Sequence, residues 1–213
     1  MSQKNSTNEY PIMRPSSLKK RQRYLAVATE LFLEQGYEGT GLDQLIKRCG
    51  GSKLTLYSYF GDKKGLLKAV VIELTEQLWE GLRFDVADEK SLNDQLMSFA
   101  CRYIELVYTP DLLKLSRLVM AQAQTDPDLA NFFLERGACH SQDVLQTFLD
   151  EQSRLGRLKI DHAFLACDQL LGALKGNRYL EALFADRLLN EQEIQDYAEH
   201  AVNAFLRSYQ CQG

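Results

Sequence analysis

The sequence has little of what marks a disulfide-rich, β-rich or membrane protein. Its five cysteines are odd in number and far apart among 213 residues, and none forms a Cys-x-x-Cys pair, so we expect free thiols in a reducing cytoplasm. Only four prolines are present, which leaves little room for a turn-rich β fold. No stretch approaches the roughly 18 apolar residues of a membrane span, and residues 1–6 lack the apolar core of a signal peptide. We therefore expect a cytoplasmic protein without a membrane partner.

Metal ligands and catalytic motifs are also scarce. The three histidines, His140, His162 and His200, lie far from one another and show no ligand spacing with the cysteines. The sequence contains no His-Glu-x-x-His, Gly-x-Ser-x-Gly, phosphate loop or dinucleotide fingerprint. We predict that the protein is not an enzyme and has no metal or cofactor. The alternative is a catalytic site assembled in space from distant residues.

The charges are distributed unevenly along the chain. The whole chain has a net charge of −4, yet residues 1–68 carry 12 basic and 6 acidic side chains, whereas residues 69–213 carry 13 and 23. A basic N-terminal part followed by an acidic remainder suggests that the N-terminal part binds a polyanion. The alternative is a solvated basic segment without a partner, and charge alone does not decide between the two.

Apolar residues recur with helical spacing through most of the chain, and no segment shows sustained strand alternation. We predict an all-α fold of about nine helices in three parts. Residues 1–17 form a flexible N-terminal arm, residues 18–78 a basic three-helix domain, and residues 79–213 a larger helical domain. The expected helices lie at about 18–35, 42–49, 53–59, 63–82, 92–107, 110–123, 127–154, 162–184 and 191–209.

Caps and one long apolar face support this division. The face comprises Leu129, Phe132, Phe133, His140, Val144, Phe148 and Leu149, on a single helix from Pro127 to Arg154. Residues of the kind that cap helix starts are Thr40, Ser52, Ser91, Thr109, Asp126, Asp161 and Asn190.

The most informative stretch is residues 41–60, where a Gly50-Gly51 turn joins two short helices inside the basic part of the chain. This is the outline of a helix-turn-helix, in which the second helix enters the major groove of DNA. Leu56 and Phe60 fall on the opposite side of that helix, and we assign them to the core. Hydroxyls and ammonium groups at its start and flanks suit base edges and phosphates, and their residues are Ser52, Lys53, Thr55, Tyr57, Tyr59, Lys63 and Lys64.

Each of these residues also has a purely structural interpretation. Tyr57 and Tyr59 are aromatic and can belong to the core. Lys63 and Lys64 can be the solvated start of the next helix. The basic run Lys19–Arg23 can be solvated as well, although it can also approach phosphates.

Two motifs extend the argument. They are Ala28-x-x-x-Phe32-x-x-x-Gly36-Tyr37-x-x-Thr40 and Gly50-x-Ser52-Lys53-x-Thr55-Leu56-Tyr57-x-Tyr59-Phe60-x-Asp62-Lys63-x-x-Leu66. In order and spacing, they resemble the N-terminal domain of TetR-family transcriptional regulators over about residues 18–78. The run Arg117–Ala121, with Pro127-Asp128-Leu129 and Gly156-Arg157-Leu158, resembles the AefR-like C-terminal subgroup more loosely.

The resemblance implies a homodimer that binds double-stranded DNA, responds to a small ligand and most often represses transcription. It adds Thr40 to the positions that touch DNA. Gly51 departs from the family, which usually has an apolar residue there. Ile46 and Leu54 stand where smaller residues are common, so they can fill the space that Gly51 leaves, or Leu54 can change which bases are contacted.

The acidic part of the chain offers candidates for a dimer interface and for an effector pocket. Small and apolar side chains of the last two helices are candidates for the interface: Gly172, Ala173, Gly176, Leu180, Val202, Phe205 and Leu206. By resemblance, large and polar side chains of the middle helices line a cavity for a small, largely apolar or amphipathic effector: Trp79, Phe99, Tyr103, Arg117, Met120, Phe133 and His140. Both sets can equally be intramolecular core.

The expected function is therefore that of a sequence-specific regulator of transcription. We expect a repressor that an effector releases from a palindromic operator by shifting the conformational population of the protein. The alternatives are an activator without ligand control and a helical protein-interaction module that does not bind duplex DNA.

Overall fold

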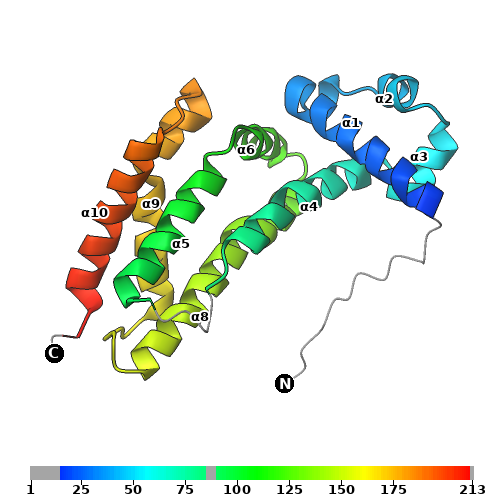
Figure 1. Cartoon of the computed structure of the whole chain (residues 1–213). Coiled ribbons are helices and arrows are strands. Elements are labelled where there is room, and N and C mark those ends of the chain that lie inside the picture. The colour runs from blue at the N-terminus through cyan, green and yellow to red at the C-terminus, as the bar shows by residue number, and fades with distance from the viewer. Residues whose placement is uncertain (1–14, 85–89, 212–213) are drawn as a thin grey trace. The chain divides into compact units, whose positions relative to one another are not determined.

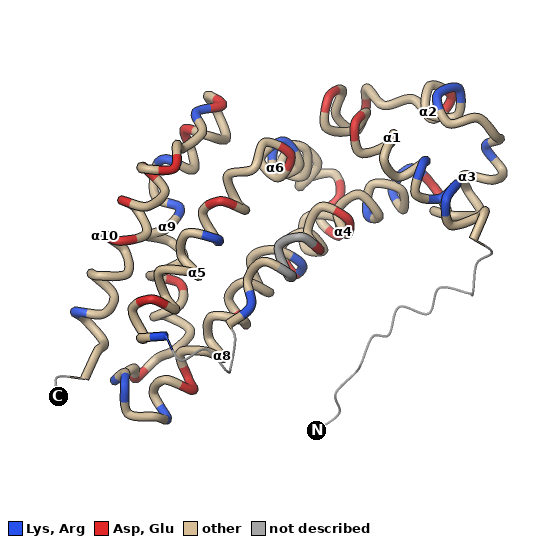
Figure 2. The backbone as a smooth tube through the Cα atoms, viewed as in Figure 1, with Lys and Arg blue, Asp and Glu red and all other residues tan. Residues whose placement is uncertain are grey.

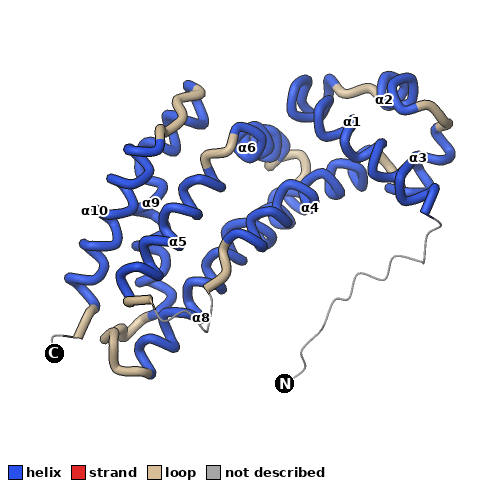
Figure 3. Tube along the Cα trace, viewed as in Figure 1, coloured by secondary structure: helices blue, strands red, loops and turns tan. Residues whose placement is uncertain are grey.

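The computed structural model describes residues 15–84 and 90–211, except for the side chains of residues 77–80. The chain divides into two compact units, Met1–Val70 and Val71–Gly213. Regular structure in the described ranges is helical, with one isolated bridge between Leu158 and Gln210 (Figures 1 and 3). The all-α prediction is confirmed. Within these ranges, no helix is both long and apolar enough to span a membrane.

The first unit is built on helix α1, which begins at Pro15, inside the range predicted as an arm. Residues 1–14 of that predicted arm lie outside the description. Gly36 has φ of 73° and interrupts α1 at the predicted end of the first helix. The helices that contribute to this unit are α1 (Pro15–Gly39), α2 (Leu42–Cys49), α3 (Lys53–Phe60) and the start of α4 (Lys63–Gly81), within which the boundary between the units falls.

One face of α1 forms the core of this first unit. Tyr24, Leu25, Ala28, Leu31 and Phe32 are buried on it at helical spacing. Leu56 and Phe60 are buried, as expected, and so is Leu45 of α2. Burial of these side chains fixes which faces of α2 and α3 remain exposed.

In the second unit, α5, α9 and α10 pack against one another, and α8 packs against α9 (Figure 1). Because α7, η1 and α8 follow without a break, the described residues form nine continuous helical segments, as predicted. The elements are α5 (Leu92–Val107), α6 (Pro110–Gln122), α7 (Pro127–Leu134), the π-helical turn η1 (Glu135–Cys139), α8 (His140–Arg154), α9 (Ala163–Ala185) and α10 (Glu191–Tyr209).

The turn η1 corrects the prediction of a single apolar face from residue 129 to residue 149. A π-turn holds more residues per turn than an α-helix, so the face that points inward before it is out of phase with the face after it. Leu129, Phe148 and Leu149 are buried, whereas Phe132 and Phe133 are only half-buried.

Four of the expected caps form as predicted. The side chains of Ser52, Ser91, Asp126 and Asn190 each accept a hydrogen bond from a backbone N–H three residues on, and Asn190 forms a full capping box with Glu193. Thr109 occupies the predicted N-cap of α6, although its side chain makes no cap hydrogen bond. Two predictions need correction, because Gly41 and His162 occupy the N-cap positions instead of Thr40 and Asp161.

Candidate DNA-binding site

The turn between α2 and α3 depends on two glycines. Gly50 has φ of 70° and Gly51 has φ of 109°, a region that side chains rarely adopt. The Tyr24 hydroxyl, from α1, donates a 2.8 Å hydrogen bond to the Gly50 carbonyl, and a Cβ atom on Gly51 would overlap that hydroxyl. Burial raises the pKa of Tyr24, which keeps the hydroxyl protonated as a donor. Tyr24 thus occupies the space beside Gly51 and ties the turn to α1.

Ser52 and Thr55 shape the first turn of α3. Ser52 Oγ accepts a hydrogen bond from the Thr55 N–H at 3.2 Å, and the two hydroxyls lie 3.1 Å apart. Ser52 is exposed and Thr55 is half-buried. The exposed end of α3 therefore presents a hydroxyl beside backbone N–H groups and the positive end of the helix dipole, an arrangement that favours anions.

The outer face of α3 is exposed and contains large side chains. Leu54 is 80% exposed and Tyr57 is 41% exposed. Ser58, which the sequence analysis did not select, is exposed on the same face because it lies four residues after Leu54. A helical projection from Leu54 would have found it. The exposure of Leu54 also means that Tyr24, and not Leu54, fills the space beside Gly51.

Lys53 forms an ion pair within its own unit. Its Nζ lies 2.8 Å from Oδ1 of Asp43 at the start of α2, and this hydrogen bond raises the pKa of Lys53. Both side chains are mostly exposed, so the pair is weak in water and a phosphate can compete for the ammonium. Asp43 was not selected from the sequence, because a carboxylate alone gives no signal of DNA binding.

Two predicted contact residues point into their own unit. Thr40 is buried, and its hydroxyl donates to the Gly36 carbonyl at 2.7 Å, so it supports the turn after α1 instead of presenting a side chain to DNA. Tyr59 is half-buried, with its ring centroid 6.2 Å from that of Tyr24 and 6.1 Å from that of Phe60. For the Tyr59 ring, the structure favours the core interpretation. Tyr57 keeps the exposed position.

Lys63 and Lys64 lie in the first turn of α4, and both are half-buried. Lys63 Nζ lies 4.5 Å from the centroid of the Tyr37 ring, a cation–π contact. Figure 2 shows basic residues on α1, at the end of α2, at the start of α3 and at the start of α4. The basic character predicted for the front of the chain is thus spread over every helix of the first unit.

None of the described residues predicted to bind an effector lines either of the two cavities reported below. Phe99 and Tyr103 are core, Met120 is exposed, and Arg117 bonds the Ala182 carbonyl and the Asp186 carboxylate at 3.2 and 2.5 Å. Phe133 and His140 are half-buried on either side of η1, and burial lowers the pKa of His140. The Trp79 side chain lies outside the description. Packing and ion pairing engage these side chains separately, and their part in an effector pocket stays a prediction.

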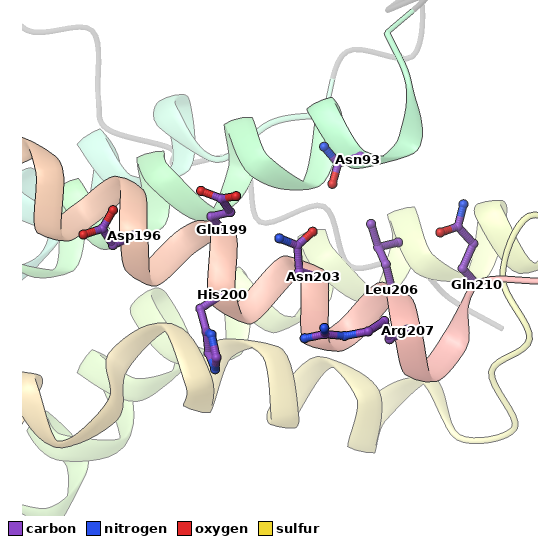
Figure 4. Close-up of a pocket in the computed structure, with 8 residues that line it drawn as sticks. All are labelled: Asn93, Asp196, Glu199, His200, Asn203, Leu206, Arg207 and Gln210. Carbon is purple, nitrogen blue, oxygen red and sulfur yellow. The ribbon is translucent and has the colours of Figure 1, made fainter.

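Two cavities of the second unit have other linings. The first, here called the α10 cavity, has about 680 Å³ and lies along the outer side of α10, with Asn93 contributed by α5 (Figure 4). Its lining is mainly polar, including Asp196, Glu199 and His200. The second, here called the α8 cavity, has about 790 Å³ and is lined by Arg83, Phe84, Gln95, Val144, Thr147, Phe148, Glu151, Gln152, Leu155 and Arg157.

Four of the seven predicted interface residues are exposed along α9, which Gly176 interrupts with φ of 54°: Gly172, Ala173, Gly176 and Leu180. The same helix exposes further large apolar side chains, Phe164, Leu165 and the 85% exposed Phe184. The other three need correction, because the apolar face of α10 packs inward: Val202, Phe205 and Leu206 are buried in the core of their own unit.

The described residues contain no group of three or more His, Cys, Asp or Glu side chains that could hold a metal ion.

Known proteins similar to this chain are transcriptional regulators. The HTH-type transcriptional regulator LmrA of Bacillus subtilis is 41% identical over 68 residues, which are 32% of this chain and 35% of LmrA. The chain thus aligns with about a third of the length of this curated relative. Two solved structures match almost throughout. A protein from Mesorhizobium loti assigned to the TetR family has a TM-score of 0.84 at 27% identity, covering 93% of this chain and 100% of that chain.

The second is the flavonoid-responsive regulator FrrA, with a TM-score of 0.79 at 28% identity, covering 92% of this chain and 99% of that one. Two family profiles also match. "Bacterial regulatory proteins, tetR family" covers residues 25–70, and "AefR-like transcriptional repressor, C-terminal domain" covers residues 94–211. Because the second profile alone spans more than half of the chain, this protein belongs to the TetR family of DNA-binding transcriptional regulators, and it is not an enzyme.

Proposed function

We propose that the protein is a homodimeric repressor that binds a palindromic operator through the outer face of α3 and is released by a small, largely apolar or amphipathic effector. The observation that carries the proposal is the exposure of Leu54 and Tyr57 on a short helix held in place by a buried opposite face. Leu54, Tyr57 and Ser58 together form an exposed surface on this helix, and a helix of this kind can enter a major groove. Leu54 suits a thymine methyl group, and the Tyr57 hydroxyl suits a phosphate oxygen.

The exposed face of α9 supports the dimer. Its small residues, Gly172, Ala173 and Gly176, permit close approach of a second helix, while Leu180 and Phe184 supply apolar area. A two-fold dimer presents two copies of α3. Copies spaced about 34–36 Å apart enter successive major grooves, so the matching operator is a palindrome.

Effector release would act as a population shift. A ligand in the second unit favours the dimer conformation that it binds more tightly, and it lowers operator affinity only if that conformation spaces the two α3 helices incorrectly. Helix α4 contributes residues to both units and is the element that we assign to this coupling.

The direct test is fluorescence anisotropy of a labelled duplex taken from upstream of the protein's own gene, with a scrambled duplex for comparison. We expect tight, salt-dependent binding to the first duplex only. Leu54→Ala should relax the preference between the two duplexes, and Tyr57→Phe should weaken binding to both. Lys53→Gln is paired with Lys114→Gln, an equal loss of charge at an exposed position of α6. Equal effects of the two lysine variants, or no binding at low salt by folded protein, would overturn the proposal.

The direction of regulation, repression or activation, needs a separate measurement of transcription. Transcription from the neighbouring promoter should rise when the gene is deleted and fall when it is restored. A fall on deletion would identify an activator. A folded protein that binds no duplex but captures a partner protein through the same helices would support the interaction-module alternative.

A further inference from the structure

The α8 cavity joins an aromatic wall to a cationic rim. Its volume of about 790 Å³ lies within the range of small-molecule pockets. The wall includes Phe84 and Phe148, whose rings stack with centroids 3.8 Å apart and an interplanar angle of 8°. Phe99 stacks on Phe84 at 4.9 Å, and Tyr103 stacks on Phe99 at 6.1 Å. A column of nearly parallel rings therefore ends at the cavity, and flat aromatic groups suit such surroundings.

The charges around the cavity are predominantly positive. Arg83 and Arg157 are both exposed side chains in its lining. The lining also includes the carboxylate of Glu151, but both of its oxygens accept hydrogen bonds from Arg154, at 2.6 and 3.0 Å. This bidentate pairing lowers the pKa of Glu151 and places the positive charge of Arg154 beside the carboxylate. The two lining arginines consequently remain available to an anion.

Gln152 holds one of these arginines in a fixed position. The residue is only 6% exposed, and its Oε1 accepts a 3.1 Å hydrogen bond from Arg157 Nη1. The Gln152 side chain also lines the cavity, and no described residue accepts a hydrogen bond from its amide nitrogen. This nitrogen can therefore donate to a ligand acceptor that lies beside Arg157.

The backbone of Arg157 is also fixed on both sides. Its N–H donates to the Gln152 carbonyl at 3.0 Å, and its carbonyl accepts from the Cys211 N–H at 3.2 Å. The preceding residue, Gly156, has φ of 71° and ends the run of α8. Such preorganisation reduces the entropy that a ligand must overcome to order the site.

We propose that the α8 cavity binds a planar aromatic ligand that carries an anionic group, of the class of fused-ring aromatic carboxylates. The rings contact the Phe84–Phe148 wall, the anion binds the guanidinium of Arg157, with Arg83 nearby at the rim, and the Gln152 amide donates to the same anion. The inference rests on the proposed function only in naming the class of effector. Binding itself requires neither DNA nor a dimer.

The test is isothermal titration calorimetry of the full chain with three probes that differ in one property each. They are 2-naphthoate, the neutral 2-naphthamide, and the saturated, non-planar decahydro-2-naphthoate. We expect one molecule of 2-naphthoate per chain and binding weaker by about tenfold or more for each of the other two. Equal affinity for the amide would overturn the anionic class, and equal affinity for the saturated acid would overturn the aromatic class.

Variants locate the site. Arg157→Gln should weaken 2-naphthoate binding by about tenfold or more, whereas the matched Lys159→Gln, an exposed lysine outside the lining, should change it by less than about twofold. Thr147→Trp places bulk into the cavity from an exposed position and should block binding without loss of the helical circular dichroism signal. Equal losses in the arginine and lysine variants, or undiminished binding to the tryptophan variant, would overturn the site.

Two further outcomes separate the proposals. If 2-naphthoate binds as expected but leaves operator affinity unchanged, the ligand inference stands and effector release through this cavity fails. If the folded chain binds operator DNA but no 2-naphthoate, the ligand inference fails and the DNA-binding function stands.

Discussion

The Tyr24 hydroxyl donates to the Gly50 carbonyl across the helix-turn-helix, and this hydrogen bond explains why the next residue is also a glycine. The hydroxyl occupies the space in which a side chain on residue 51 would stand. Most TetR-family members have an apolar residue at this turn position. Here an aromatic side chain from α1 supplies the packing instead, so Tyr24 and Gly51 are interdependent.

We therefore predict that Gly51→Ala destabilises the first unit by roughly 1–3 kcal/mol, because it combines backbone strain with overlap. Combining it with Tyr24→Phe, which removes the overlapping oxygen, should cost less than the sum of the two single substitutions. Denaturant unfolding followed by circular dichroism measures both. The matched control is Gly137→Ala in the second unit, where φ is not positive and the added Cβ meets open space, so its cost should stay within about 0.5 kcal/mol. Strict additivity of the pair would contradict this account.

A second prediction concerns the ion pair between Lys53 and Asp43. Because the Asp43 carboxylate competes with phosphate for the ammonium, Asp43→Asn should strengthen duplex binding, and the slope of log affinity against log salt should steepen by about one unit. Anisotropy titrations at several salt concentrations give both quantities. Glu191→Gln removes the same charge from the start of α10 and should have a smaller effect. If the two substitutions act equally, overall charge and not this ion pair controls binding.

A third prediction concerns the dimer interface that we propose on the exposed face of α9. Leu180→Glu and Phe184→Glu each place a carboxylate in the proposed interface, so we expect a monomer and weaker operator binding, because one half-site binds less tightly than two. Size-exclusion chromatography with light scattering reports the mass. Leu134→Glu changes an equally exposed leucine of α7 and should leave the mass unchanged. A dimer that persists in both α9 variants would place the interface elsewhere.

The cysteines give a fourth prediction. Cys139 and Cys211 are exposed, whereas Cys167 is 0% exposed, and burial raises the pKa of its thiol to about 12. With Ellman's reagent at about pH 8, Cys139 and Cys211 should react quickly and Cys167 only after unfolding, because the thiolate is the reactive form.

The same raised pKa affects stability at alkaline pH. Since the folded state favours the neutral Cys167 thiol, its contribution is present below pH 9.0, the ordinary thiol value, and is lost as the pH rises toward 12. Cys167→Ala should flatten the decline of the unfolding free energy in that range. In the experiment with Ellman's reagent, the double variant Cys139→Ser, Cys211→Ser should lack the fast phase, which checks the assignment of that phase to these two thiols.

The sequence was sufficient for the elements whose signals are local. Helical spacing, glycine breaks and hydroxyl or amide caps predicted nine helices and the turn at Gly50, because each depends on residues within a few positions. The inward face of α3 was predicted for the same reason. Thr40 was misplaced because its partner, the Gly36 carbonyl, competes with the cap of α2, and the choice between them depends on the geometry of the break in α1.

Contacts between distant segments were not predictable in this way. In the sequence, Leu180 is an apolar helical residue like Val202, Phe205 and Leu206. Only the packing of α10 against α5 and α9 shows that the latter three are buried in the core, whereas Leu180 is exposed. Likewise, Arg157 gave no signal of a ligand site. Its position depends on Gln152 and on the end of α10, which lies more than fifty residues away.

The five-residue η1 turn makes chain length critical between α7 and α8. Deletion of a single residue there would let the segment relax to α-helical geometry, and each residue of an α-helix accounts for about 100° of rotation. Leu145, Phe148 and Leu149 would then turn away from the core that they now fill. The continuous segment of α7, η1 and α8 should therefore tolerate many substitutions at the five positions of η1, but no insertion or deletion there.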